Sequence, residues 1–319
     1  MGKGSLGLCL AAWAAGAFAV ACAEGTAPNE DLVTPQVDAA APTKDSGVTK
    51  DSGHPANDAT ANDTGAADTA TADEPDAAAP TPLVYGHSSD TLYAYDPTTR
   101  VTTKIAPFSG CTTNVLTQVI DIAIDSSSHA YATTFDGFYS LDLSTAGCTI
   151  IKAGAYPNSL SFVPKGTLDP NAEALVGYSG STYLRIDTQT GTITTVGSLT
   201  GYVSSGDIVS VTGGGSFLTV TGSGCTTGDC LLQIDPTTGD MLQNYGALTH
   251  SAVYGLGYWA GALYGFDEGG DLFQILGSNG DGGLLSSDLT QDGGVPWWGA
   301  GSTTAAPVKD ADGGSISIK

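Results

Sequence analysis

The chain has 319 residues, with 10 basic and 33 acidic side chains and a net charge of −23. This charge argues against a nucleic acid or an anionic membrane surface as a partner, because no stretch supplies a basic face. Self-repulsion that keeps the protein soluble accounts for the acidic excess, and affinity for a divalent cation or a cationic ligand is the alternative.

Residues 1–22 are predicted to be a signal peptide. Lys3 gives a positive start, and an apolar, Ala-rich stretch follows from Leu6 to Val20. The stretch is too short for a transmembrane helix, and no second candidate follows it. The sequence therefore predicts an exported protein.

Two cleavage sites compete. Ala19-Val20-Ala21-Cys22 resembles a bacterial lipoprotein box, in which Cys22 becomes the acylated N-terminus. The alternative is ordinary signal cleavage after an A-x-A site, Ala21-Cys22-Ala23. Acylation at Cys22 is favoured because it leaves an even number of cysteines in the mature chain. It predicts a lipid anchor in the cell envelope, at the outer membrane or a periplasm-facing leaflet.

Residues 23–81 are predicted to be a disordered acidic linker. They consist almost entirely of Ala, Thr, Asp, Pro, Ser and Gly, without an aromatic residue. Such a composition buries too little apolar surface to offset the entropy of ordering. The expected role is a tether between a membrane anchor and a folded domain.

A short phrase recurs along residues 82–307. It reads Leu92-Tyr-Ala-Tyr-Asp96-Pro-Thr-Thr at its first appearance, and Leu231-Leu-Gln-Ile-Asp235-Pro-Thr-Thr-Gly at its fourth. Its Asp positions are 96, 142, 187 and 235, and Leu276 takes the fifth, so the spacings are 46, 45, 48 and 41. A period near 45 in a chain rich in Val, Ile, Thr and Tyr predicts an all-β fold, a β-propeller with five four-stranded blades. The aspartates are expected to form turns.

The ends of the domain predict how the ring closes. Pro296 to Gly301 resembles an inner strand with no blade after it, whereas Leu83 to Gly86 and Leu92 to Tyr95 resemble second and third strands with no inner strand before them. We therefore expect a first blade with one strand from the C-terminal end and three from the N-terminal end. Residues 308–319 are predicted to be a flexible tail.

The repeats resemble known propeller families. Asp121-Ile-Ala-Ile-Asp125-Ser-Ser-Ser-His129-Ala-Tyr131-Ala is similar to the inner half of an NHL-type repeat, and the Leu-x-x-Ile-Asp-Pro-x-Thr-Gly phrase resembles the outer half of YVTN-type blades. The layout resembles exported, acyl-anchored bacterial propellers of unassigned function from myxobacteria-like organisms. The sequence lacks the Gly-His and Trp-Asp pairs of WD repeats, the Asp box of sialidases and the blade tryptophan of quinoprotein dehydrogenases.

Two groups of residues are candidates for binding at the mouth of the central channel. Asp121 and Asp207 occupy equivalent places on two inner strands, where propeller lactonases hold a metal; the alternative is that each caps the start of its strand. Aromatic side chains of the last blade and the closing strand could stack on a sugar or a peptide, or could simply pack between blades. They include Trp259, Trp297 and Trp298.

Two disulfides are expected in an exported protein. Cys225 and Cys230 enclose a short loop between two strands and form a local pair, which leaves Cys111 and Cys148 as the second pair.

No histidine has the spacing of a metal-ligand motif, and no serine lies in a nucleophile motif. The leading expectation is therefore a non-catalytic binding module at the cell envelope, with a protein or glycan partner and no cofactor. The alternative is a metal-dependent, lactonase-like propeller hydrolase, with a divalent cation such as calcium in the channel.

Overall fold

The computed structural model describes residues 83–111, 118–225, 228–278, 284–290 and 294–309. The chain divides into two units, Met1–Ala72 and Asp73–Lys319, and all the described residues belong to the second. The predicted signal peptide, Cys22, the linker and residues 310–319 of the predicted tail lie outside the described residues.

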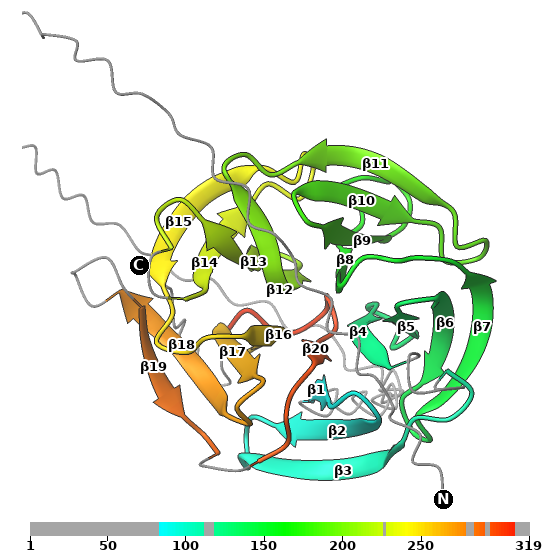
Figure 1. The fold of residues 1–319 in the computed structure, drawn as a ribbon, viewed down its shortest axis with the longest axis horizontal. Helices are drawn as coiled ribbons and strands as arrows, with labels where there is room; N and C mark the ends of the chain where they lie inside the picture. Colours follow the sequence, from blue (N-terminus) through cyan, green and yellow to red (C-terminus); the bar gives the residue numbers. More distant parts are fainter. Residues whose placement is uncertain (1–82, 112–117, 226–227, 279–283, 291–293, 310–319) are drawn as a thin grey trace, which may run out of the picture. The chain divides into compact units, whose positions relative to one another are not determined.

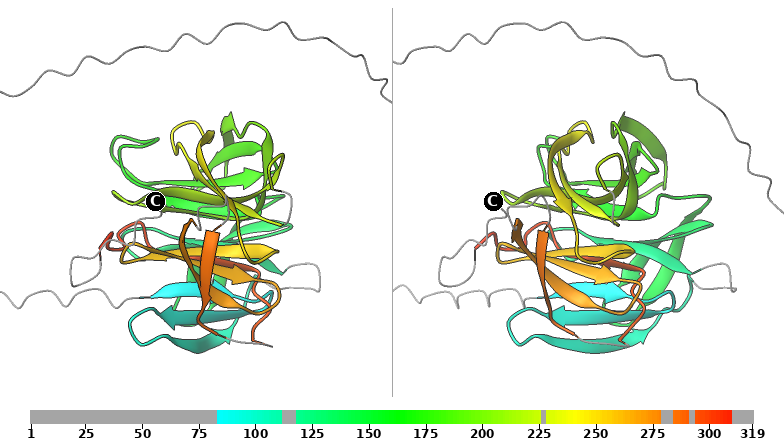
Figure 2. Two further views of the ribbon diagram at one scale, coloured as in Figure 1. Left: turned by 90° about the vertical axis from the view of Figure 1, so that its left-hand side faces the viewer. Right: turned by 60° about the vertical axis from the view of Figure 1, so that its left-hand side comes forward.

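The described residues form a five-bladed β-propeller, as the repeat predicts (Figure 1). Each blade is an antiparallel sheet of four strands. Figure 2 shows the twist of the individual sheets from two further directions. From the channel outward, blade 1 consists of β20 (Gly299–Gly301), β1 (Val84–His87), β2 (Thr91–Asp96) and β3 (Val101–Pro107).

The other four blades follow in chain order, and each runs from its inner to its outer strand. Blade 2 consists of β4 (Val119–Ile124), β5 (Ala130–Thr134), β6 (Gly137–Asp142) and β7 (Gly147–Ala153). Blade 3 consists of β8 (Ser159–Val163), β9 (Ala174–Ser179), β10 (Thr182–Ile186) and β11 (Ile193–Ser198). Blade 4 consists of β12 (Tyr202–Val211), β13 (Gly215–Gly222), β14 (Cys230–Ile234) and β15 (Met241–Ala247). Blade 5 consists of β16 (Val253–Trp259), β17 (Ala262–Asp267), β18 (Leu272–Ser278) and β19 (Leu284–Asp288).

Burial decreases from the channel to the rim. Every residue of the inner strands β4 and β8 is buried, whereas the outer strands β3 and β11 are mostly exposed. The core therefore lies between neighbouring sheets, as expected when inner strands are covered on both faces and outer strands on one.

The recurring aspartates form the turns between the third and fourth strands of blades 1 to 4. Each carboxylate accepts a hydrogen bond from the backbone N–H two residues later, over 2.8–3.0 Å. The fourth residue after the aspartate has positive φ in all four turns. Glycine takes this place twice (Gly191, Gly239), whereas Arg100 and Ala146 adopt the same left-handed conformation in blades 1 and 2.

The ring closes between the two ends of the domain, as predicted. β20 pairs antiparallel with β1, with Gly299 opposite His87 and Gly301 opposite Tyr85. The closing strand is shorter than the sequence indicated, because the two tryptophans precede it. Trp297 is 2 % exposed and packs edge-on between Tyr93 of blade 1 and Phe266 of blade 5, so its indole fills the seam between the first and last blades.

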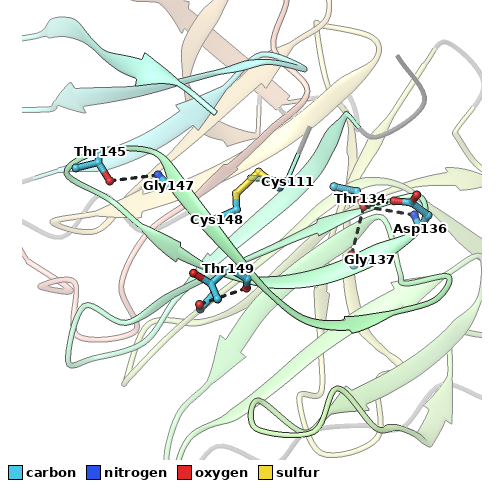
Figure 3. The surroundings of a disulfide bond; sticks show 9 residues. Cys111, Thr134, Asp136, Gly137, Thr145, Gly147, Cys148 and Thr149 are labelled. Carbon is cyan, nitrogen blue, oxygen red and sulfur yellow. Dashed lines mark hydrogen bonds between the residues drawn. A yellow bond between two sulfur atoms is a disulfide. The ribbon is translucent and has the colours of Figure 1, made fainter. Parts of the chain in front are cut away.

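Both expected disulfides are present. Cys111 follows β3 and is joined to Cys148 in β7, which fastens the connection between blades 1 and 2 to the outer strand of blade 2 (Figure 3). Gly110 has a φ of +84°, and a Cβ there would meet the Cys148 carbonyl oxygen at 2.4 Å. The connection therefore needs a glycine beside the disulfide.

Removing the two disulfides is expected to have unequal effects. Cys111 and Cys148 are 37 residues apart and Cys225 and Cys230 are 5 apart. Because loop entropy grows with the length of the closed loop, the C111S/C148S variant should lose about 4 kcal/mol of unfolding free energy and the C225S/C230S variant about 2 kcal/mol. Denaturant unfolding of both variants tests this, and equal losses would contradict it.

Candidate functional site

Asp121 is the third residue of β4 and Asp207 is the sixth residue of β12, each beside a shift in the pairing register of its strand, and both side chains are fully buried. Asp121 accepts a hydrogen bond from the N–H of Ile122 at 2.8 Å and another, from Leu160 of blade 3, at 2.5 Å. Asp207 accepts the equivalent bonds from Ile208 at 2.6 Å and from Leu256 of blade 5 at 2.8 Å. Each carboxylate thus accepts a bond from the residue that follows it in its own strand and ties that strand to the next blade. The structure places both inside the protein and not at an open mouth.

The two carboxyl groups also lie close enough to interact with each other, and we infer that they share one proton. Burial raises the pKa of Asp121 well above its usual range, and the charge of Asp207 raises it further. Burial raises the pKa of Asp207 as well, although the hydrogen bond from Asp121 opposes that rise. Two buried carboxyl groups in contact cannot both ionise at low cost, and a shared proton relieves the repulsion.

His87 adds a third buried group at the same end of the channel. Its ring reaches over Gly299, where an added Cβ would lie 2.3 Å from Nε2 of His87 and 2.7 Å from Oδ1 of Asp121. Its Nδ1 lies 2.9 Å from the Ser88 carbonyl oxygen, and its Nε2 has no hydrogen-bond partner among the described residues. Burial lowers the pKa of His87 to about 4, so the ring is neutral near pH 7.

The other end of the channel is crossed by the segment that follows β20. Thr303 donates a hydrogen bond to the Asp125 carbonyl oxygen of blade 2 at 2.9 Å, and Thr304 donates one to the Glu173 carboxylate of blade 3. The Thr304 carbonyl oxygen accepts a bond from the N–H of Thr212 in blade 4 at 2.9 Å. One short segment therefore contacts three blades and covers the channel where the inner strands end.

The predicted tryptophans lie close to the seam between blades 5 and 1. Trp259 is 8 % exposed and belongs to the hydrophobic core of that region, together with Trp297. Trp298 is half-buried, and its backbone N–H donates to the His87 carbonyl oxygen at 2.8 Å. These positions agree with the packing alternative for Trp259 and Trp297.

A second polar cluster, absent from the sequence-based candidates, lies on blade 5. We call it the His250 cluster; it consists of His250, Asp267, Asp271 and Asp288. Nδ1 of His250 lies 2.9 Å from an Asp267 oxygen, and its Nε2 lies 3.2 Å from an Asp288 oxygen. His250 precedes β16, and Asp267 is the last residue of β17. Asp271 directly precedes β18, and Asp288 is the last residue of β19. The antiparallel pairing of these strands brings the four residues to the same end of the sheet. No motif spacing marks them in the sequence, and only the fold reveals the cluster.

An open groove of about 550 Å³ lies on the face where the inner strands end, between blades 2 and 3. Its lining comes from the β4–β5 turn, the β8–β9 loop and the turns at Thr188 and Thr212, and includes His129, Tyr131, Lys165, Asn171 and Glu173. Glu173 is fixed there, because it accepts a hydrogen bond from the Ser126 N–H at 2.8 Å as well as the one from Thr304. The volume falls within the range of small-molecule sites.

The two disulfides indicate an extracytoplasmic protein. No helix within the described ranges has the length and apolar character that a membrane span requires.

No protein-family model and no curated protein matches this chain. Among solved structures, it is similar to a symmetrical protein whose de novo evolutionary emergence was shaped by folding constraints. That match has a TM-score of 0.45 and 12% identity, and covers 70% of this chain and 99% of the other. A chain of a nidogen/laminin complex has a TM-score of 0.42 and 9% identity, with 69% and 97% covered. The β-propeller domain of Cps50 (Swd1) from Myceliophteria thermophila has a TM-score of 0.36 and 10% identity, with 63% and 64% covered. The similarity is distant and concerns the propeller fold alone.

The structural role of Asp207 predicts a large stability loss in Asp207→Ala. The substitution leaves the buried N–H groups of Ile208 and Leu256 without their acceptor, and each unsatisfied group costs about 1–3 kcal/mol. We expect a loss of about 2–5 kcal/mol in denaturant unfolding. Asp187→Ala is the control, since Asp187 accepts its bonds in an exposed turn, and it should lose less than about 1 kcal/mol. Equal losses in the two variants would contradict the assigned role.

His87 predicts a specific dependence of stability on pH. The pKa of His87 is about 4 in the folded protein and 6.5 ordinarily. Its contribution to the free energy of unfolding is therefore complete above pH 6.5 and is lost as the pH falls towards 4. The loss should reach about 2–3 kcal/mol. Asp121 and Asp207 act in the opposite sense, because their raised pKa values stabilise the fold at low pH and that contribution is lost as the pH rises. Unfolding curves from pH 7 to 4 should therefore fall less steeply for His87→Gln than for the natural protein, and parallel curves would exclude this role.

Proposed function

We propose that the protein is an exported, non-catalytic binding module of the cell envelope. Its propeller is the binding unit, residues 23–81 are its tether, and acylated Cys22 is its anchor. The proposal rests on the hydrogen bonds that the two carboxylates of the channel make. Asp121 and Asp207 accept backbone N–H bonds from neighbouring blades, which leaves little capacity to hold a catalytic metal. This use disfavours the lactonase-like alternative.

The groove between blades 2 and 3 is the proposed binding site. It presents hydroxyl, amide, imidazole and ammonium groups beside Tyr131, a lining that suits a ligand with many hydroxyl groups. The net charge of −23 repels polyanions such as acidic polysaccharides. A neutral oligosaccharide of the envelope is therefore the ligand class that fits best.

Titration calorimetry with neutral oligosaccharides tests this proposal, with chitohexaose, cellohexaose and maltohexaose as probes. One class should bind to the natural protein, and K165A/N171A should weaken its affinity at least tenfold while unfolding at the same temperature. Lys104→Ala is the matched control, since Lys104 lies on the exposed outer strand β3, and it should bind as the natural protein does.

Two results would count against the binding module. One is the absence of binding to all neutral probes. The other is calcium-dependent hydrolysis of lactones that disappears in a folded Asp121→Asn variant, which would favour the hydrolase.

A further inference from the structure

The His250 cluster has the composition of a transition-metal site. One ring nitrogen of His250 and one carboxylate oxygen each from Asp267 and Asp271 all lie within 4.8 Å of one another. The distance from Nδ1 is 2.9 Å to the Asp267 oxygen and 3.9 Å to the Asp271 oxygen. One imidazole nitrogen and two carboxylate oxygens form a mixed ligand set that suits zinc and its neighbours better than calcium, which prefers oxygen ligands alone.

The imidazole ring is held in position from two sides. Nε2 faces an Asp288 oxygen at 3.2 Å, and the ring stacks on Phe273 with centroids 3.8 Å apart and planes 7° apart. In metal sites, the ring nitrogen that does not bind the ion commonly donates its proton to a carboxylate, which fixes the tautomer and the ring orientation. Asp288 lies where such a partner is needed.

The carboxylates are also held in position. Asp267 has a side chain that is 6 % exposed, and its Oδ1 accepts a bond from the Asp271 N–H at 2.9 Å. Its other oxygen therefore stays directed at His250. Three carboxylate side chains thus face a single imidazole ring in a region that is partly shielded from solvent, an arrangement that a bound cation would stabilise.

From this geometry we propose a zinc-type divalent metal site formed by His250, Asp267 and Asp271. The ion takes the place of the proton on Nδ1, which is released to solvent, and the proton on Nε2 is donated to Asp288. Three protein ligands leave at least one coordination position open for water or an exogenous ligand. Asp288 is a positioning residue in this arrangement.

The site also adjoins the closure of the ring. The Asp267 carbonyl oxygen accepts a hydrogen bond from the Trp297 N–H at 3.2 Å, and Trp297 fills the seam between blades 5 and 1. A bound ion would hold the β17–β18 turn to the loop before β16 and would thereby support the closing segment. Thermal stability should consequently report binding.

The test uses the whole protein after chelator treatment and dialysis, with Zn²⁺ as the probe and Mg²⁺ and Ca²⁺ for comparison. Elemental analysis should give one tightly bound zinc per chain. Zinc at a hundredfold excess over its Kd should raise the unfolding temperature by about 5–10 °C. Magnesium and calcium should have little effect. Cobalt(II) in the same site should give a visible absorption spectrum that zinc abolishes by displacement.

Variants separate a metal site from an ion-paired histidine. His250→Ala should abolish stoichiometric binding, and Asp288→Asn should weaken it about 10–100-fold while the fold is retained. His129→Ala is the matched control. His129 also lies 2.9 Å from a carboxylate, that of Asp125, but its side chain is 71 % exposed and only one carboxylate pairs with it within the described residues.

The proposal is overturned if zinc does not bind stoichiometrically to the natural protein, which would identify the cluster as an ion pair only. It is also overturned if His129→Ala loses as much zinc as His250→Ala, or if a folded Asp288→Asn variant binds zinc as tightly as the natural protein does.

Discussion

The structure depends on satisfying the polar groups at the centre of a small ring. Five inner strands converge there, and the buried N–H groups of Leu160 in β8 and Leu256 in β16 are directed at carboxylates of neighbouring blades. A buried N–H without an acceptor costs as much as a lost hydrogen bond. Asp121 and Asp207 supply acceptors for their own strands and for the next blades. Their desolvation is offset by four backbone donors and a shared proton, and the ring gains fixed contacts between blades 2 and 3 and between blades 4 and 5.

This constraint shapes where the protein can act. The start of the channel is occupied by the two carboxyl groups and His87, and its end is crossed by the segment around Thr304. The positions open to a partner therefore lie on the two faces of the ring. One face carries the groove between blades 2 and 3, and the other carries the His250 cluster. A rigid ring with sites on its loops is a common arrangement for binding proteins.

The sequence predicted the fold well because the repeat has a direct physical cause. Four of the five copies contain an aspartate that caps a turn, and a turn between the third and fourth strands must recur once per blade. The closing strand was also predictable, because unpaired strands at the two ends of the domain require each other. Its length was not, because Trp297 and Trp298 read as strand residues although their packing places them before it.

The polar clusters were harder to predict because they assemble across the fold. The ring of His87 lies beside Gly299, which is more than 200 residues later in the chain, and this contact brings the ring close to Asp121. The His250 cluster joins four residues that are unevenly spaced in the sequence. They lie close together because strand pairing brings them to the same end of one sheet. The sequence did identify Asp121 and Asp207 as an equivalent pair. It could not decide between ligand and cap, because that choice depends on backbone N–H groups of other blades.

Infrared spectroscopy can determine whether Asp121 and Asp207 link the blades through a shared buried proton. At pH 6, an exposed aspartate with a pKa of about 3.9 is ionised. We predict that the natural protein retains the carbonyl band of a protonated carboxylic acid at this pH, and that Asp121→Asn loses the band. If the natural protein lacks the band at pH 6, both carboxylates are ionised, and the proton-sharing link between the blades is contradicted.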